Sequence, residues 1–268
     1  MPLPLSAPFK DALAGTERPL AGMWVCSGSP LVAEICAGAG LDWLLIDAEH
    51  SPNGLESILA QLQAVHGYPV QVLVRPPVND TVLIKQYLDL GVQNLLIPMI
   101  NSVEDAEAAV AATRYPPEGV RGVGSALARA ARWNRVPDYL ATASHTVSVT
   151  VQIESTAAVD AVEDILAVDG VDAIFVGPSD LAASMGLLGQ QEHPQVCAAV
   201  EHCLAAAGRA GTPAGVNAFT PATAQHYLDA GAQFILVGAD VALLARGSEA
   251  LATDFVHSPR STTPHTSY

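Results

Sequence analysis

Short apolar runs alternate with longer Ala- and Leu-rich segments along most of this chain. The short runs are rich in Val, Ile and Leu, which is typical of strands buried in a parallel sheet. They predict strands over residues 22–27, 43–48, 70–75, 94–99, 147–153, 173–176, 213–217 and 233–238. The longer segments predict helices over residues 30–37, 55–65, 82–90, 103–114, 156–167, 195–210, 221–230 and 241–255.

Strand-and-helix units that repeat eight times over about 235 residues predict a (β/α)₈ TIM barrel. We expect a short leading helix within residues 3–14 and a long loop over residues 115–146. Residues 1–256 would form one barrel domain, and the polar tail 257–268, rich in Pro, Ser and Thr, would be disordered. A doubly wound open sheet is the alternative fold, but no GxGxxG follows the first strand.

Two carboxylates follow neighbouring strands in the segment 147–180. Glu154 comes directly after one strand, and Asp180 follows the next across Gly-Pro-Ser. Both strands of a right-handed strand–helix–strand unit point the same way, so both carboxylates emerge at one edge of the sheet. Asp180 alone could simply cap a helix. The pair instead favours a site for Mg²⁺ or Mn²⁺, because zinc would normally recruit more His or Cys.

Further polar residues stand at the C-terminal ends of other predicted strands, where barrel enzymes carry their chemistry. His50 is the one histidine at such an end, and Asp47 and Glu49 beside it can orient it and make it more basic. Asp47 and Glu49 alternate along the chain, so we do not expect both to point into the barrel. Arg75 suits the stabilisation of a developing oxyanion.

The sixth predicted strand and its neighbour add two more candidates. Ser179 precedes a short helix, so its amide and that of Asp180 can bind a carboxylate at the positive helix end. Gln152 lies on the same strand as Glu154, two residues before it, and therefore belongs to the same end of the barrel.

The composition narrows the possible partners. A net charge of −15 and a pI near 4.7 argue against nucleic acid and anionic membranes. The opening has no signal-peptide pattern and no apolar run is long enough for a membrane helix, so we expect a cytoplasmic protein. Cysteines 26, 36, 197 and 203 form no CxxC pair, and we expect them to be reduced packing residues.

The chain resembles the 4-hydroxy-2-oxoheptanedioate aldolases, metal-dependent enzymes of the phosphoenolpyruvate/pyruvate barrel superfamily. The resemblance covers residues 9–255 and is carried by LLIDAEHSPN, VLVRPPVND, IPMINS, RYPPEGVRGVGSALARAARWNRVPDYL, VQIES and FVGPSDLAASMG. It implies a homohexamer that uses Mg²⁺, Mn²⁺ or Co²⁺. The roles that it implies are metal ligation by Glu154 and Asp180, proton transfer by His50, transition-state stabilisation by Arg75, substrate contacts from Gln152, Ser179 and Asp180, and support of His50 by Asp89.

These observations together predict a class II aldolase that cleaves 4-hydroxy-2-oxo acids, such as 4-hydroxy-2-oxoheptanedioate, to pyruvate and an aldehyde such as succinate semialdehyde. A Schiff-base aldolase needs a lysine at a strand end, and the only lysines are Lys10, before the barrel, and Lys85, within a helix. A lyase acting on a CoA thioester and a non-catalytic metabolite-binding barrel remain as alternatives.

Overall fold

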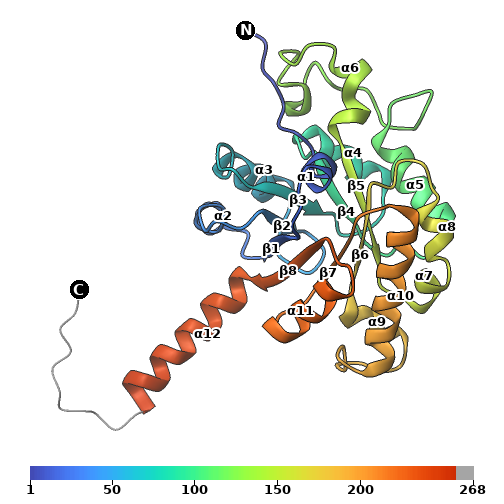
Figure 1. Cartoon of the computed structure of the whole chain (residues 1–268). Coiled ribbons are helices and arrows are strands. Elements are labelled where there is room, and N and C mark those ends of the chain that lie inside the picture. Colours follow the sequence, from blue (N-terminus) through green and yellow to red (C-terminus); the bar gives the residue numbers. More distant parts are fainter. Residues whose placement is uncertain (258–268) are drawn as a thin grey trace.

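The computed structural model describes residues 1–257 and shows a closed barrel of eight parallel strands (Figure 1). Each strand hydrogen-bonds to its neighbours in sequence, and β8 closes the barrel on β1. The strands are β1 (Leu20–Val25), β2 (Trp43–Asp47), β3 (Gln71–Arg75), β4 (Asn94–Ile97), β5 (Ser148–Ile153), β6 (Ala173–Val176), β7 (Ala214–Asn217) and β8 (Phe234–Ala239). The predicted TIM barrel is therefore confirmed.

Helices follow the strands and cover the outside of the barrel. Their bounds are α2 (Pro30–Ala37), α3 (Leu55–Ala64), α4 (Thr81–Asp89), α5 (Val103–Thr113), α7 (Thr156–Asp160), α8 (Val162–Leu166), α9 (Pro178–Ser184), α10 (Pro194–Ala210), α11 (Pro221–Asp229) and α12 (Asp240–Ala252). The helix predicted over residues 156–167 is split, because Ala161, with φ −98° and ψ 7°, leaves the helical region. None of the described helices is long and apolar enough to cross a membrane.

The predicted loop 115–146 is an ordered excursion with short helical turns, η1 (Arg129–Ala131), α6 (Tyr139–Thr142) and η2 (Ala143–Thr146). It has a small apolar core of its own, formed by Ala130, Ala131, Tyr139 and Ala143. Periodicity missed these turns because none of them is long enough to show a repeat.

The leading helix α1 (Phe9–Ala14) closes the end of the barrel at which the strands begin. The Phe9 amide donates to Asn94 Oδ1 at 2.6 Å, at the first residue of β4. The Phe9 ring packs on Trp43 and Phe234, with ring centroids 5.7 and 5.3 Å away. The aromatic cluster fills the barrel here, so the only end left for substrate is the one at which the strands finish, which we call the mouth.

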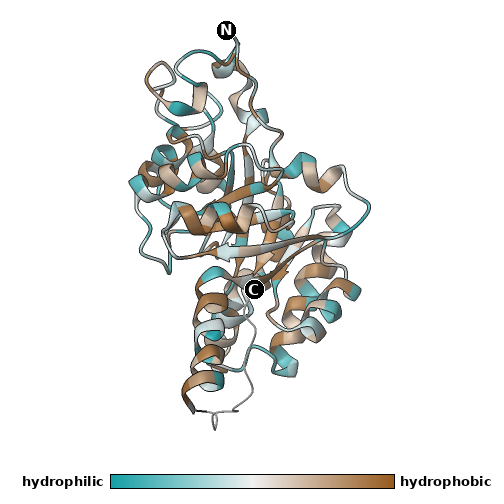
Figure 2. Ribbon diagram, turned by 90° about the vertical axis from the view of Figure 1, so that its left-hand side faces the viewer, coloured by the Kyte–Doolittle hydropathy of each residue, from teal (hydrophilic) through white to brown (hydrophobic). Residues whose placement is uncertain are grey.

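The last helix differs from the others because it projects away from the barrel wall (Figures 1 and 2). Apolar side chains along it are exposed, namely Val241, Leu243, Leu244 and Leu251. A short turn, η3 (Thr253–His257), follows, and the rest of the predicted tail lies outside the described residues. Within one chain, α12 thus leaves an apolar surface in water.

Two glycines make room for the aromatic cluster inside the barrel. A Cβ at Gly215 would lie 2.3 Å from the Phe234 ring, and one at Gly22 would lie 2.3 Å from the Trp43 ring. We predict that Gly215→Ala lowers the free energy of unfolding by about 1–3 kcal/mol, the usual cost of overpacking a core. Urea unfolding followed by circular dichroism measures it.

Gly208→Ala is the matched control, because Gly208 lies within α10 with no heavy atom within 4 Å of the added Cβ. There alanine should raise the free energy of unfolding by up to about 1 kcal/mol through its better helix propensity. Equal effects of the two substitutions would show that the barrel interior is not tightly packed at Gly215.

Candidate active site

Strand pairing brings the first two polar residues of the mouth together. Asp47 and Arg75 are the last residues of β2 and β3, and the parallel register places them side by side. Arg75 is almost fully buried, and its Nε donates to Asp47 Oδ1 at 2.9 Å. The guanidinium lies 4.3 Å from the centroid of the Trp24 ring on β1. Ring and carboxylate together hold the guanidinium plane in one orientation.

Arg75 also reaches the groups that follow β2 and β5. Its Nη1 lies 2.8 Å from Glu49 Oε2 and donates to Gln152 Oε1 at 3.4 Å. Glu49 Oε2 is buried and still lacks a hydrogen-bond donor of good geometry, so this oxygen keeps an open acceptor position. One cation is thus shared by two carboxylates and an amide, which keeps negative charge in excess at this point.

The expectation that Asp47 and Glu49 cannot both face the barrel is wrong. β2 ends at Asp47, and the turn that follows returns Glu49 to the same side. Asp47 shapes this turn, because its carboxylate accepts from the amides of Glu49 at 3.0 Å and His50 at 3.2 Å. Burial alone would raise the pKa of Asp47, but Arg75 and these amides outweigh it and lower the pKa below its ordinary value.

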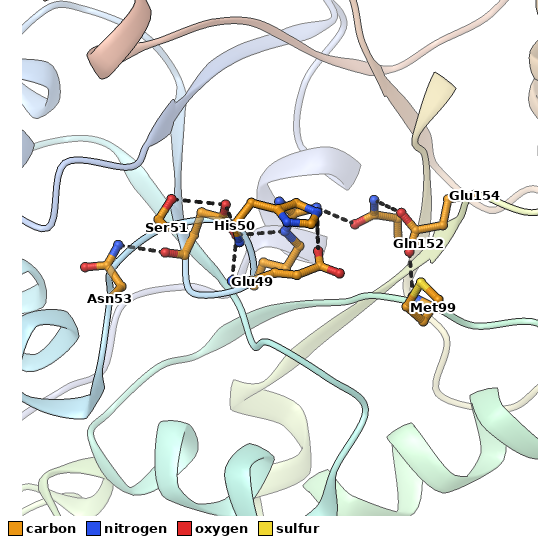
Figure 3. Close-up of polar contacts among 9 residues, drawn as sticks. Glu49, His50, Ser51, Asn53, Met99, Gln152 and Glu154 are labelled. Atoms are coloured by element: carbon orange, nitrogen blue, oxygen red, sulfur yellow. Dashed lines mark hydrogen bonds and ion pairs between the residues drawn. The ribbon is translucent and has the colours of Figure 1, made fainter. Parts of the chain in front are cut away.

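His50 stands at the rim of the mouth with an exposed side chain. Figure 3 shows it among the polar residues that follow β2 and β5. Its Nε2 lies 3.9 Å from Glu49 Oε2, and Asp47 holds its backbone amide, not its ring. The turn therefore fixes the backbone of His50, whereas its imidazole ring stays accessible to water and to a substrate. This is a suitable place for a proton-transfer group.

Glu154 lies deeper, at the end of β5, and is also buried. Its Oε1 accepts from the Met99 amide at 2.7 Å, and its Oε2 accepts from Gln152 Nε2 (Figure 3). Burial raises the pKa of Glu154 to about 7, and the negative charges of Glu49 and Asp180 add to the rise. The carboxylates of Glu49 and Asp180 thus lie near enough to Glu154 to repel its negative charge, and the charge of Arg75 offsets part of this repulsion.

This donor set fits a hard divalent cation. Glu154 and Asp180 offer only oxygen ligands, and their mutual repulsion is relieved when a cation lies between them. Gly177 keeps the volume open, because a Cβ there would lie 3.3 Å from Glu154 Oε2. No group of three or more His, Cys, Asp or Glu in residues 1–257 is arranged to hold a metal ion, so Glu154 and Asp180 would be its only carboxylate ligands from those residues. Two protein carboxylates would leave positions for water and substrate, as Mg²⁺ usually requires.

Ser179 and Asp180 lie in the first turn of α9, directly after β6. Ser179 lines a cavity of about 80 Å³ beside the mouth, together with Asn217, Phe219 and Tyr227. The cavity therefore adjoins the start of α9, where Ser179 stands.

Asp89 is the one candidate that the chain does not bring to the mouth. It ends α4, which runs from the mouth to the opposite end of the barrel, and it pairs there with Arg121 Nη2 at 3.2 Å. A contact between Asp89 and His50 would need a second copy of the chain, so the support of His50 by Asp89 stays a prediction.

Sequence reasoning missed two contributors. Trp24 looks like an ordinary buried residue of β1, and only barrel closure puts its ring against Arg75. Met99 contributes its amide, which points at Glu154 because the residue adopts a left-handed conformation with φ 58°. Neither role has a sequence signal.

Comparison with known proteins now identifies the family. Residues 20–247 match the family described as HpcH/HpaI aldolase/citrate lyase. This chain belongs to that family. It is an aldolase, a carbon–carbon lyase, and aldolases of the family are metal-dependent.

Individual relatives agree with this assignment. The chain is 55% identical over 257 residues to a hydroxypyruvate/pyruvate aldolase of Deinococcus radiodurans, covering 96% of this chain and 92% of that protein. It is 53% identical over 247 residues to a 4-hydroxy-2-oxo-heptane-1,7-dioate aldolase of Salmonella dublin, covering 92% and 94%. A solved family member from Burkholderia cenocepacia J2315 superposes with a TM-score of 0.88 at 42% identity, covering 93% of this chain and 99% of that one.

The raised pKa of Glu154 gives a stability prediction for the metal-free protein. Its ordinary value is 4.5 and its folded value about 7, so the folded state binds more protons than the unfolded state between these pH values. The free energy of unfolding should therefore fall by about 3 kcal/mol as pH rises from 4.5 to 7. Glu154→Gln removes this loss, so the difference between the two proteins in EDTA isolates it. Parallel pH profiles of their unfolding free energies would contradict the environment described for Glu154.

Proposed function

We propose that this chain is a class II pyruvate aldolase that reversibly cleaves 4-hydroxy-2-oxo acids to pyruvate and an aldehyde. The observation that carries the proposal is the buried Arg75, fixed beside the Glu154–Asp180 carboxylate pair at the mouth. An aldol cleavage develops negative charge on the former keto oxygen, and a preorganised guanidinium stabilises such charge. The name of the Deinococcus radiodurans relative includes pyruvate, and that of the Salmonella dublin relative includes a 4-hydroxy-2-oxo acid.

Glu154 and Asp180 would hold the divalent ion, which we propose to be Mg²⁺, Mn²⁺ or Co²⁺. When bound, it supplies Lewis-acid polarisation of the 2-oxo acid. Gln152 keeps Glu154 in place through its side-chain amide, and Met99 does so through its backbone amide. We propose substrate contacts for Gln152, Ser179 and Asp180, with the amides of the first turn of α9 facing the substrate carboxylate.

Different side chains then take the proton and stabilise the enolate. His50, exposed at the rim, takes the proton of the C4 hydroxyl, directly or through one water. The C3–C4 bond breaks to give the aldehyde, and its electrons pass to the pyruvate enolate. Arg75 faces that enolate oxygen with a guanidinium that Asp47 and Trp24 have already oriented, so little reorganisation is needed.

Three alternatives have distinct signatures. A Schiff-base aldolase lacks its lysine, because Lys10 pairs with Asp172 at the closed end of the barrel and Lys85 lies within α4. A CoA-thioester lyase would cleave a carbon–carbon bond of an acyl-CoA thioester and leave 4-hydroxy-2-oxo acids intact. A non-catalytic barrel would bind 2-oxo acids without releasing pyruvate. Pyruvate release from a panel of 4-hydroxy-2-oxo acids separates an aldolase from the last two alternatives and ranks the aldehydes, succinate semialdehyde included. Loss of that release in EDTA separates a metal-dependent aldolase from a Schiff-base aldolase.

Removal of the metal tests whether pyruvate release depends on a divalent ion. EDTA should abolish pyruvate release, and Mg²⁺, Mn²⁺ or Co²⁺ should restore it in the wild-type protein. Glu154→Gln should not be restored at the same concentrations, because it loses one of two charged ligands. Full activity of the metal-free Glu154→Gln variant would remove the basis for metal dependence.

Two variants separate proton transfer from enolate stabilisation. His50→Ala should reduce cleavage by about 10²–10⁴-fold, the contribution of a positioned acid–base group. It should reduce proton–deuterium exchange at the pyruvate methyl much less, because that exchange involves no C4 hydroxyl. Arg75→Ala should damage both reactions, and Arg75→Lys should rescue only in part, because a point charge lacks the planar fork. NMR follows the exchange beside the cleavage assay, and the opposite pattern would reverse the two roles.

Assembly into a homohexamer is the third part of the proposal. The exposed apolar residues of α12 support self-association, since a surface of this kind is normally covered. We further propose that Asp89 supports His50 from a neighbouring copy, because one chain holds the two residues at opposite ends of the barrel.

Light scattering should report a mass well above the 27.8 kDa of one chain at micromolar concentration. His50→Ala and Asp89→Asn should each be impaired alone. Mixed and reassembled, they should regain activity, because some sites then combine an intact His50 with an intact Asp89. A stable monomer, or no recovery on mixing, would contradict the shared site.

A further inference from the structure

A cavity of about 280 Å³ lies at the closed end of the barrel, away from the mouth. The starts of β3 and β4 form part of its wall, together with the segment before β3 and the turn η1. Two arginines of the long excursion, Arg129 and Arg132, line it. Five of the ten arginines of this acidic chain lie between residues 114 and 135, so positive charge is concentrated in this part of the molecule.

The two guanidinium groups converge on one point of the cavity wall. A Cβ at Gly91 would lie 2.8 Å from Arg129 Nη1 and 3.2 Å from Arg132 Nη1. Gly91 has φ 91°, which a residue with a side chain rarely adopts, so both conformation and space keep this position open.

The guanidinium groups of Arg129 and Arg132 use only some of their N–H donors. Arg129 Nη1 donates to Leu90 O at 2.8 Å, and Arg132 Nη1 donates to Arg129 O at 3.0 Å. The first bond is an ordinary contact at the C-terminus of α4, which attracts a cation. It accounts for one nitrogen. In the described residues the other guanidinium nitrogens of the pair make no hydrogen bond, and none is among the solvent-sealed unpartnered atoms.

No acidic side chain neutralises the pair. Within residues 1–257 neither arginine has a carboxylate at ion-pair distance. The acidic residue that lines the cavity, Asp42, is already held by Arg18 through both of its oxygens. Burial, together with the charge of Arg132, lowers the pKa of Arg129 to about 10. A half-buried cation pair of this kind lacks a counterion.

We propose that this cavity is a binding site for a small oxyanion, a carboxylate or a phosphate, held between Arg129 and Arg132. Guanidinium forks match such anions in geometry, and a charge-assisted bond from each would remove the repulsion between them. The volume suits a small dicarboxylate or a phosphate ester. The site lies at the other end of the barrel from Arg75 of the same chain, so its ligand stabilises the fold and the excursion 115–146 without entering that chain's mouth.

Calorimetric titration tests the proposal on the metal-loaded enzyme, with saturating pyruvate to fill the mouth. Inorganic phosphate and succinate are the two probes, and the tighter one assigns the ligand class. Wild type should bind one of them with a dissociation constant below about 1 mM. Arg132→Gln should weaken binding at least tenfold. Arg209→Gln, which removes an equal charge from an exposed ion pair with Glu163, should bind as wild type does.

Thermal unfolding supplies a second measurement. The preferred anion at a hundredfold excess over its dissociation constant should raise the Tm of the wild type by about 5 °C or more. Arg132→Gln should show no such rise at that concentration. Dissociation constants above about 1 mM for both probes, or equal binding by wild type and Arg132→Gln, would overturn the proposal.

A crystal soaked in selenate gives a readout that needs no variant. The anomalous signal of selenium should appear within hydrogen-bond distance of both Arg129 and Arg132. Selenate found only at the mouth or on the outer surface would overturn the site. Neither result bears on the aldolase reaction, so this proposal and the proposed function can fail separately.

Discussion

A single buried guanidinium balances a mouth that is otherwise made of carboxylates. Arg75 neutralises Asp47 fully and Glu49 in part, and its position depends on the parallel register of β2 and β3. The pKa values record the imbalance: that of Asp47 falls below its ordinary value, whereas that of Glu154 rises to about 7. An enzyme that must gather an anionic substrate among carboxylates needs this arrangement. In the proposed reaction, the residual negative charge would recruit the metal, and the fixed cation would face the charge that develops.

The rigidity that Arg75 requires comes from both ends of the barrel. At the closed end, the Phe9 ring packs on Trp43 and Phe234, and these two rings in turn lie against Gly22 and Gly215, where any side chain would collide with them. At the mouth, the Trp24 ring and Asp47 hold the guanidinium plane directly. A close-packed interior transmits such constraints, because side chains that interdigitate leave little room for strands to slide.

The sequence was sufficient for the barrel and for most of the mouth, since apolar periodicity locates strands and polar residues at their ends mark chemistry. Glu154, Asp180, Arg75 and His50 all lie where that reasoning placed them. The same reasoning was wrong where the direction of a side chain depends on a strand boundary that moves by one or two residues. Glu49 faces Arg75 because β2 ends earlier than predicted, and strand alternation does not survive a turn. It also failed where tertiary closure decides, as for Trp24, and where helix direction carries Asp89 away from the mouth.

At Met99, the backbone amide and the side chain have separate places in this site. Glu154 is held by the backbone amide of residue 99, while the side chain of that residue is more than half exposed at the rim. An amide is supplied by every amino acid except proline, so any side chain that tolerates the left-handed conformation of residue 99 keeps the hold on the carboxylate. Positions of this kind allow an enzyme family to change what its entrance admits while the groups that break the bond remain in place. Divergence in aldehyde preference can therefore accumulate at the rim without passing through an inactive intermediate.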